Sequence, residues 1–84
     1  MMGGTVAEQM DQTCRNVQTV LEAAGSSLNK VIKVQLYFKS LRDLDKEVNE
    51  VYYQHFPHKP VRTSVEVRGL MLDARIEIEV IALQ

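Results

Sequence analysis

The residues best placed for chemistry lie in two short segments near the end of the chain, residues 61–67 and 75–80. Both segments alternate strictly between apolar and polar residues, which is typical of half-buried strands. Successive side chains of a strand point to opposite faces, so the polar residues of each segment share one face. If the two strands pair as a hairpin, a guanidinium and several carboxylates lie on one side of one sheet, where a ligand site or subunit interface would need them. These residues are Arg62, Ser64, Glu66, Glu77 and Glu79.

Arg62 and Glu77 have two interpretations on this basis. They are either part of a ligand site or a cross-strand ion pair on a solvated sheet, worth at most about 1 kcal/mol. From the residues alone, the ion pair is the favoured interpretation. Glu66 and Glu79 are interpreted as surface or interface charges.

The composition predicts one small soluble domain that spans residues 1–84. Hydrophobic residues make up 45% of the chain and charged residues 25%, as in ordinary globular proteins. A net charge of −1 argues against a protein that mainly binds nucleic acid. No apolar run approaches the roughly 20 residues of a membrane span, and no export leader is visible. We therefore expect a cytoplasmic protein, or a mitochondrial one if the natural chain begins further upstream.

The cysteine and histidine residues do not predict a metal site. Cys14 is the single cysteine, and it lies on the apolar stripe of a predicted helix, so we interpret it as a small core residue. His55 and His58 flank Pro57 without a third ligand at a recognisable spacing. We expect both histidines to be solvated loop residues.

Three regular elements are predicted before the two polar segments. A capping box formed by Thr5 and Glu8 starts a helix over residues 6–24, and Gly25 ends it. Alternation over residues 31–39 predicts a strand, and helical spacing predicts a second helix over residues 42–56. The strand at 31–39 is expected to direct one apolar set of side chains into the core, namely Ile32, Val34, Leu36 and Phe38.

The element order α-β-α-β-β predicts an α+β fold. The central strand–helix–strand unit implies a parallel strand pair, and the last two strands are expected to form a hairpin. Two helices can cover only one face of a three-stranded sheet. An oligomer in which several sheets meet face to face would cover the other face, which is expected to carry Lys33, Gln35, Tyr37, Arg62, Ser64, Glu66, Glu77 and Glu79.

The chain as a whole resembles the RidA/YjgF family of imine–enamine deaminases, whose members are also named translation inhibitors or L-PSP endoribonucleases. The closing segments 60–67 and 76–82 match the most diagnostic signature of that family. The resemblance spans nearly the whole chain in order and is also carried by residues 12–17, 21–28, 31–34, 48–52 and 56–57.

The resemblance implies a chorismate-mutase-like mixed sheet with two helices on one face, assembled as a homotrimer with ligand clefts between subunits. It implies hydrolysis of reactive 2-imino or 2-enamino acids to 2-keto acids and ammonia, without a metal or an organic cofactor. The expected partners are therefore a small imino or keto acid and further copies of the chain, with no membrane and no nucleic acid.

The resemblance also assigns roles to four residues. Arg62 matches the arginine that grips the substrate carboxylate, as its forked guanidinium suits. Glu77 matches the catalytic glutamate that positions or activates the attacking water. Ser64 lies where many members carry a cleft-lining cysteine, and Asn49 matches an asparagine for which we infer a cleft-supporting role.

One departure from the family pattern keeps a second hypothesis open. Members normally carry a strand-rich segment before the first helix, where this sequence has only Met1 to Gly4. The alternative to the enzyme is therefore a non-catalytic trimeric module that binds small carboxylates or partner proteins. A ribonuclease or translation inhibitor has little physical support, because the chain lacks a basic patch interleaved with aromatic residues.

Overall fold

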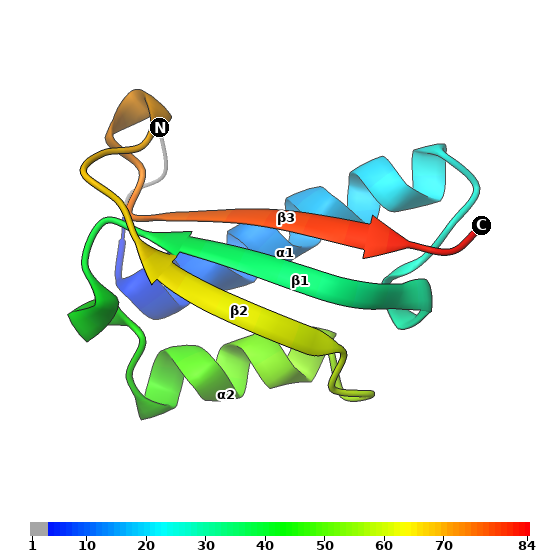
Figure 1. The fold of residues 1–84 in the computed structure, drawn as a ribbon, viewed down its shortest axis with the longest axis horizontal. Helices are drawn as coiled ribbons and strands as arrows, with labels where there is room; N and C mark the ends of the chain where they lie inside the picture. Colours follow the sequence, from blue (N-terminus) through cyan, green and yellow to red (C-terminus); the bar gives the residue numbers. More distant parts are fainter. Residues whose placement is uncertain (1–3) are drawn as a thin grey trace.

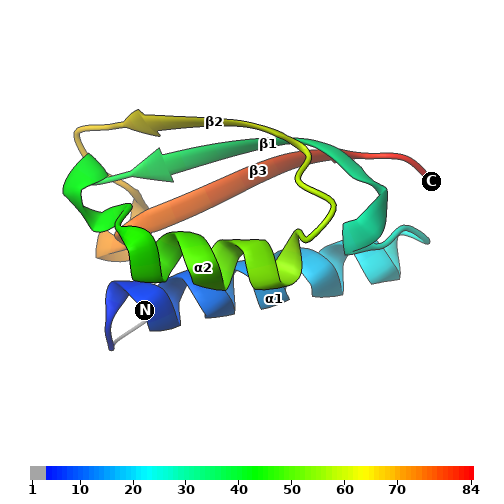
Figure 2. The same cartoon turned by 90° about the horizontal axis from the view of Figure 1, so that it is seen from below.

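A computed structural model describes residues 4–84 and has the predicted order of helices and strands. The two helices lie side by side under one face of a three-stranded sheet (Figures 1 and 2). Neither helix is long and apolar enough to cross a membrane. In chain order the elements are α1 (Val6–Ala23), β1 (Val31–Phe38), α2 (Lys46–His55), β2 (Val61–Glu66) and β3 (Ile76–Ala82).

The sheet has the strand order β2-β1-β3, so the predicted hairpin between the last two strands is wrong. β1 pairs in parallel with β2, as predicted, and antiparallel with β3 on its other side (Figure 1). The segment after β2 therefore carries the chain across the end of the sheet to the far edge. There β3 packs against α1, which gives both elements an apolar partner.

The register of β2 places its polar residues on the face that the helices cover. Arg62 lies beside Val34, and Ser64 lies beside Leu36. Neighbouring residues on paired strands point to the same face, and Val34 and Leu36 are fully buried against the helices. Arg62 and Ser64 therefore lie on the helix side of the sheet, and the prediction that they occupy its open face is wrong.

The register of β3 places its carboxylates on the opposite, open face. Glu77 lies beside Tyr37, and Glu79 lies beside Gln35. The open-face positions predicted for Glu77 and Glu79 are thus confirmed, but these residues do not share a face with Arg62. The error arose because alternation fixes the faces within each strand and leaves the relation between two strands undetermined.

An irregularity at the start of β1 changes the face of one residue. The pairing with β3 shifts between Val31 and Lys33, so that Val31 is buried while Ile32 is 49% exposed. An extra residue in a strand interrupts its alternation, and the predicted core position of Ile32 is therefore wrong. Val34 and the next two alternate residues are buried as predicted.

The ends of α1 agree with the prediction, whereas the start of α2 does not. The capping box of Thr5 and Glu8 is present, and Gly25 has a positive φ of 82° after α1. α2 begins later than predicted, because Leu41–Asp43 forms a separate 3-10 turn and the side chain of Asp45 accepts from the backbone N–H of Val48.

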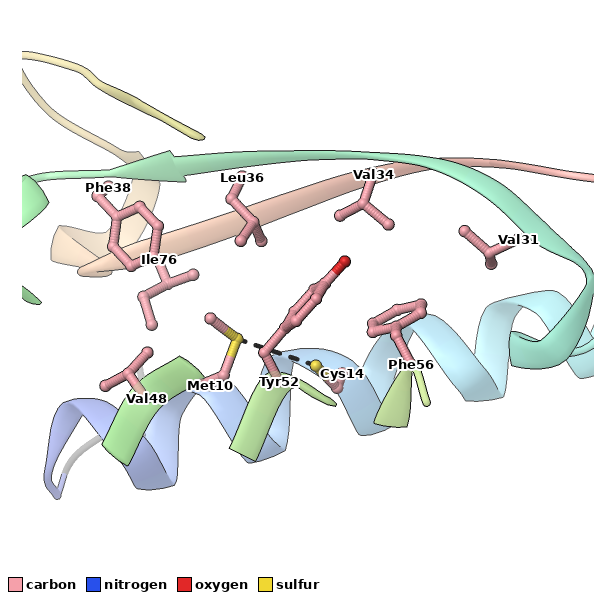
Figure 3. Close-up of a cluster of buried hydrophobic side chains, with 10 residues drawn as sticks. All are labelled: Met10, Cys14, Val31, Val34, Leu36, Phe38, Val48, Tyr52, Phe56 and Ile76. Atoms are coloured by element: carbon pink, nitrogen blue, oxygen red, sulfur yellow. Dashed lines mark hydrogen bonds between the residues drawn. The ribbon is translucent and has the colours of Figure 1, made fainter. Parts of the chain in front are cut away.

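The core lies between the helices and the sheet, and β2 contributes no residue to it among those described (Figure 3). Within it, the ring of Tyr52 stacks on Phe56 with a centroid separation of 4.8 Å. The buried side chains are Met10, Cys14, Val31, Val34, Leu36, Phe38, Val48, Tyr52, Phe56 and Ile76. β2 therefore presents polar groups where β1 and β3 present apolar ones.

His55 joins the two helices and is not the solvated loop residue that was predicted. It is the last residue of α2, its side chain is 15% exposed, and its Nε2 lies 2.8 Å from a carboxylate oxygen of Asp11 on α1. The hydrogen bond with His55, together with that from Arg15, holds the pKa of Asp11 below its ordinary value of 3.8.

The hydroxyl of Tyr52 gives a first prediction, because it is buried without a hydrogen-bond partner among the described residues. Burial raises its pKa to about 12. An unpaired buried hydroxyl costs free energy, so we expect Tyr52→Phe to leave the free energy of unfolding unchanged or raise it by about 1 kcal/mol. Urea titration measures this difference. Phe38→Ala, which opens a cavity in the same core, should lower stability by about 3–5 kcal/mol. A clear loss of stability in Tyr52→Phe would show that the hydroxyl is bonded.

Candidate functional site

Arg62 is held by three side chains of α2. Its Nη1 donates a hydrogen bond to Oδ1 of Asn49 at 2.6 Å. The guanidinium carbon lies over the rings of Tyr52 and Tyr53, 4.8 and 5.3 Å from their centroids. We call these four residues the Arg62 cluster. The structure thus brings together two predicted site residues, Arg62 and Asn49.

Local sequence explains why this cluster forms. Asn49, Tyr52 and Tyr53 are spaced by three and four residues, which places them on one face of α2. The chain then turns through Phe56 to Lys59, where Lys59 adopts a positive φ of 51°, and returns as β2 above the same helix. Arg62 is therefore carried back over α2 by the start of the strand.

The two tyrosines are the cluster members that sequence reasoning missed. Tyr52 fits the helical spacing of apolar residues that predicts the second helix, and that spacing gives Tyr53 no role. The available signal was an amide and two aromatic residues at helical spacing just before an arginine-bearing strand. Arginine packs favourably on aromatic faces, so this combination indicates a held guanidinium.

Ser64 and Glu66 follow Arg62 on the same face but differ in their contacts. Ser64 is half-buried, and its hydroxyl has no hydrogen-bond partner among residues 4–84. Glu66 accepts a hydrogen bond from the backbone N–H of Leu41 at 2.9 Å, which fixes the turn before α2. Ser64 is therefore available to a ligand, whereas Glu66 has a structural contact.

Glu77 lies on the open face of the sheet within an acidic group. The hydroxyl of Tyr37, beside it on β1, donates to Oε1 of Glu79 at 3.3 Å. Partial burial, followed by the nearby carboxylates of Glu79 and Glu77, raises the pKa of Tyr37. Glu77 itself is exposed, so its carboxylate is accessible from the open face.

The structure does not bring Arg62 and Glu77 together within one chain. Their strands lie two positions apart in the sheet, and their register differs by three residues, because Glu77 is level with Val65 through Tyr37. Strand spacing and rise then separate the two Cα atoms by about 14 Å, with the side chains on opposite faces. One small ligand cannot contact both residues of one copy.

A concave surface lies between α1 and the free edge of β3. This open groove has a volume of about 400 Å³ and is mainly apolar, with polar groups from Thr13 and Asn16. Glu77 lies at its rim, and Val20 on its wall is 67% exposed. The groove was not predicted, although Val20 lies beside the expected apolar stripe of the helix.

The described residues contain no metal centre and no reactive thiol. No group of three histidine, cysteine or acidic side chains within residues 4–84 is arranged to hold a metal ion. Cys14 is fully buried, with its sulfur 3.9 Å from that of Met10. Burial, with a smaller effect of the Asp11 charge, raises the pKa of the thiol to about 12.

Comparisons with known proteins show which family this chain belongs to. The family model for endoribonuclease L-PSP matches residues 1–84. A RutC family protein of Pyrococcus horikoshii is 49% identical over 80 residues, which cover 94% of this chain and 63% of the relative. This chain belongs to the endoribonuclease L-PSP family, that is, the RidA/YjgF family.

Two further members of the family carry informative names. Reactive Intermediate Deaminase A, a chloroplastic protein of Arabidopsis thaliana, is 38% identical over 79 residues, covering 93% of this chain and 42% of the relative. The crystal structure of E. coli TdcF with bound serine is 33% identical with a TM-score of 0.90 and covers 100% of this chain and 68% of that one. The chain thus spans less than two thirds of the curated relatives named here.

The burial of Cys14 gives a second prediction. We expect the folded protein at pH 8 to resist alkylation by iodoacetamide, because the thiol is buried and its pKa is about 12. The protein unfolded in urea should react completely, and intact mass measures both outcomes. Rapid labelling of the folded protein would contradict the core position of Cys14.

Proposed function

We propose that this protein hydrolyses reactive 2-imino acids to 2-keto acids and ammonia. The observation that carries the proposal is the Arg62 cluster, in which Asn49 and two aromatic rings hold a guanidinium able to bind a carboxylate. The family includes a relative named as a reactive intermediate deaminase, and the TdcF structure holds serine, a small molecule with a carboxylate. Both names are consistent with a ligand of this class.

We further propose that the site is completed by a second copy of the chain in a homotrimer. Arg62 and Glu77 lie on opposite faces of one sheet, so a ligand between them requires Arg62 from one copy and Glu77 from another. The open face also has an apolar end, where Val61 is 67% exposed and Ile81 is 54% exposed on either side of Lys33. Burial of this apolar end favours association through the face that carries Glu77.

The proposed reaction gives each of the three site residues one role. Arg62 binds the substrate carboxylate through two charge-assisted hydrogen bonds, and the hydroxyl of Ser64 lines the same side of the cleft. Glu77 accepts a proton from water as the oxygen adds to the imine carbon, and the nitrogen gains a proton. The hydroxyl of this adduct then gives its proton to the departing nitrogen as the carbon–nitrogen bond breaks, which releases ammonia and leaves the 2-keto acid.

The coverage of the relatives supports one alternative. The chain spans 63% of the Pyrococcus relative, so longer members have residues beyond the matched region that could complete the pocket. A chain that lacks them would keep Arg62 and bind small carboxylates without turnover. The cytoplasmic location stays a prediction, since one relative is named as chloroplastic.

Removal of the guanidinium tests the reaction. Arg62→Ala should lower the rate of ammonia release from 2-iminobutanoate generated in situ by roughly 100-fold, because two hydrogen bonds to a charged group are lost. Arg68→Ala removes an exposed arginine outside the site and should retain the wild-type rate. If the rate of ammonia release with wild-type protein does not exceed the rate without protein, the proposed enzymatic activity is contradicted. Calorimetric binding of 2-oxobutyrate without turnover would favour the alternative.

Mixed oligomers test the two-copy site. Arg62→Ala and Glu77→Gln should each have strongly reduced activity alone, whereas the two variants refolded together should regain part of the wild-type activity. In a mixed trimer, one copy supplies an intact Arg62 and its neighbour an intact Glu77. Mass measurement by light scattering confirms the oligomer in each sample. A mixed trimer that stays inactive while wild type is active would overturn the two-copy site.

A further inference from the structure

The guanidinium of Arg62 lies against two aromatic rings and donates one hydrogen bond to an amide. Nη1 donates to Asn49, and among the described residues no partner is found for Nε or Nη2. A guanidinium stacks through its flat face and donates hydrogen bonds in its plane. The two rings are 76° apart, so the guanidinium can stack flat on only one of them, and Nε and Nη2 have no hydrogen-bond partner among the described residues. These two form a fork that matches the two oxygens of a carboxylate.

The two rings beside this guanidinium are set almost at right angles. Tyr52 and Tyr53 have ring centroids 5.0 Å apart and an interplanar angle of 76°. Tyr52 is fully buried and stacked on Phe56, so its ring is fixed by the core. Tyr53 is half-buried, and Lys59 lies over its ring with Nζ 5.5 Å from the centroid. The rings thus form a corner with one fixed wall and one wall near the surface.

The surface wall of this corner borders an open groove of about 560 Å³. Asn49, Tyr53 and Lys59 all line the groove, so the hydrogen-bond partner of Arg62, one of its aromatic partners and a second cation share one accessible surface. Lys46 and Lys59 bring positive charges to this groove and Glu50 a negative one, while Arg62 lies behind Tyr53 and Asn49 and is not among the lining residues. Tyr53 is the aromatic residue that borders both the groove and the guanidinium.

We propose that Tyr53 is a positioning residue for carboxylate binding. Together with Tyr52 and Asn49, it holds the guanidinium so that the Nε and Nη2 fork is presented to the ligand. Arginine is long and flexible, and its ordering before binding lowers the entropy lost when the ligand binds. The assignment of the ligand as a 2-imino or 2-keto acid rests on the proposed function, while the ordering of Arg62 does not.

Two variants of Tyr53 separate the role of the ring from that of the hydroxyl. Tyr53→Phe keeps an aromatic face, and Tyr53→Leu removes it. We expect Tyr53→Leu to weaken binding of 2-oxobutyrate by roughly 2- to 5-fold in calorimetry, in line with an accessible cation–π contact, while Tyr53→Phe binds nearly as wild type. In the deamination assay, KM should rise for Tyr53→Leu with kcat unchanged. A Tyr53→Leu variant that fails to fold is replaced by Tyr53→Met.

The ordering of Arg62 is measured without any ligand. NMR gives the exchange rate of the Nε proton of Arg62 with water, and the signal is assigned by its loss in Arg62→Lys. We expect a several-fold faster exchange in Tyr53→Leu than in wild type or Tyr53→Phe. Equal exchange rates in all three proteins would overturn the proposal, as would faster exchange with unchanged 2-oxobutyrate affinity. If wild type does not bind 2-oxobutyrate, the proposed function fails and the exchange rates alone decide the role of Tyr53.

Discussion

The central position of β1 is the constraint on which the rest of the structure depends. β1 pairs with both other strands, so its alternation of buried and open side chains fixes the faces of β2 and β3 together. Val34 directs Arg62 toward the helices, and Tyr37 directs Glu77 away from them. A shift of either pairing by one residue would reverse the exposure of a whole strand. Because Val34 and its alternate neighbours fill the core, the register is strongly specified.

This arrangement gives the two outer strands different tasks. β3 contributes Ile76 to the core and packs against α1, so one of its faces stabilises the fold by apolar contacts. β2 places polar residues over α2 and contributes nothing to the buried cluster within the described chain. A charged residue on the helix-facing side of a strand needs compensating partners, and α2 supplies an amide and two aromatic faces for Arg62. The polar face of β2 is thus compatible with the fold because of what lies beneath it.

Local chemistry made much of the fold predictable from the sequence. The capping box at Thr5, the glycine after α1 and the alternation of the strands depend on residues a few positions apart. These features gave the number, type and order of the elements. The position of β3 depends on contacts with β1 and α1 that are distant in sequence, and adjacency wrongly favoured a hairpin with β2. The irregularity that exposes Ile32 likewise has no local sequence signal that the alternation could reveal.

The candidate site was predictable to the same limited extent. The pattern and the family resemblance identified Arg62 and Asn49, which the structure brings within hydrogen-bond distance. Neither could show that Arg62 and Glu77 lie on opposite faces, because that relation is set by the register of each strand on β1. A site that uses both residues is therefore incomplete in one copy, however well each residue is held. In the proposed trimer, association would build the site as well as cover the apolar end of the sheet near Val61, so the open face would serve assembly and chemistry at once.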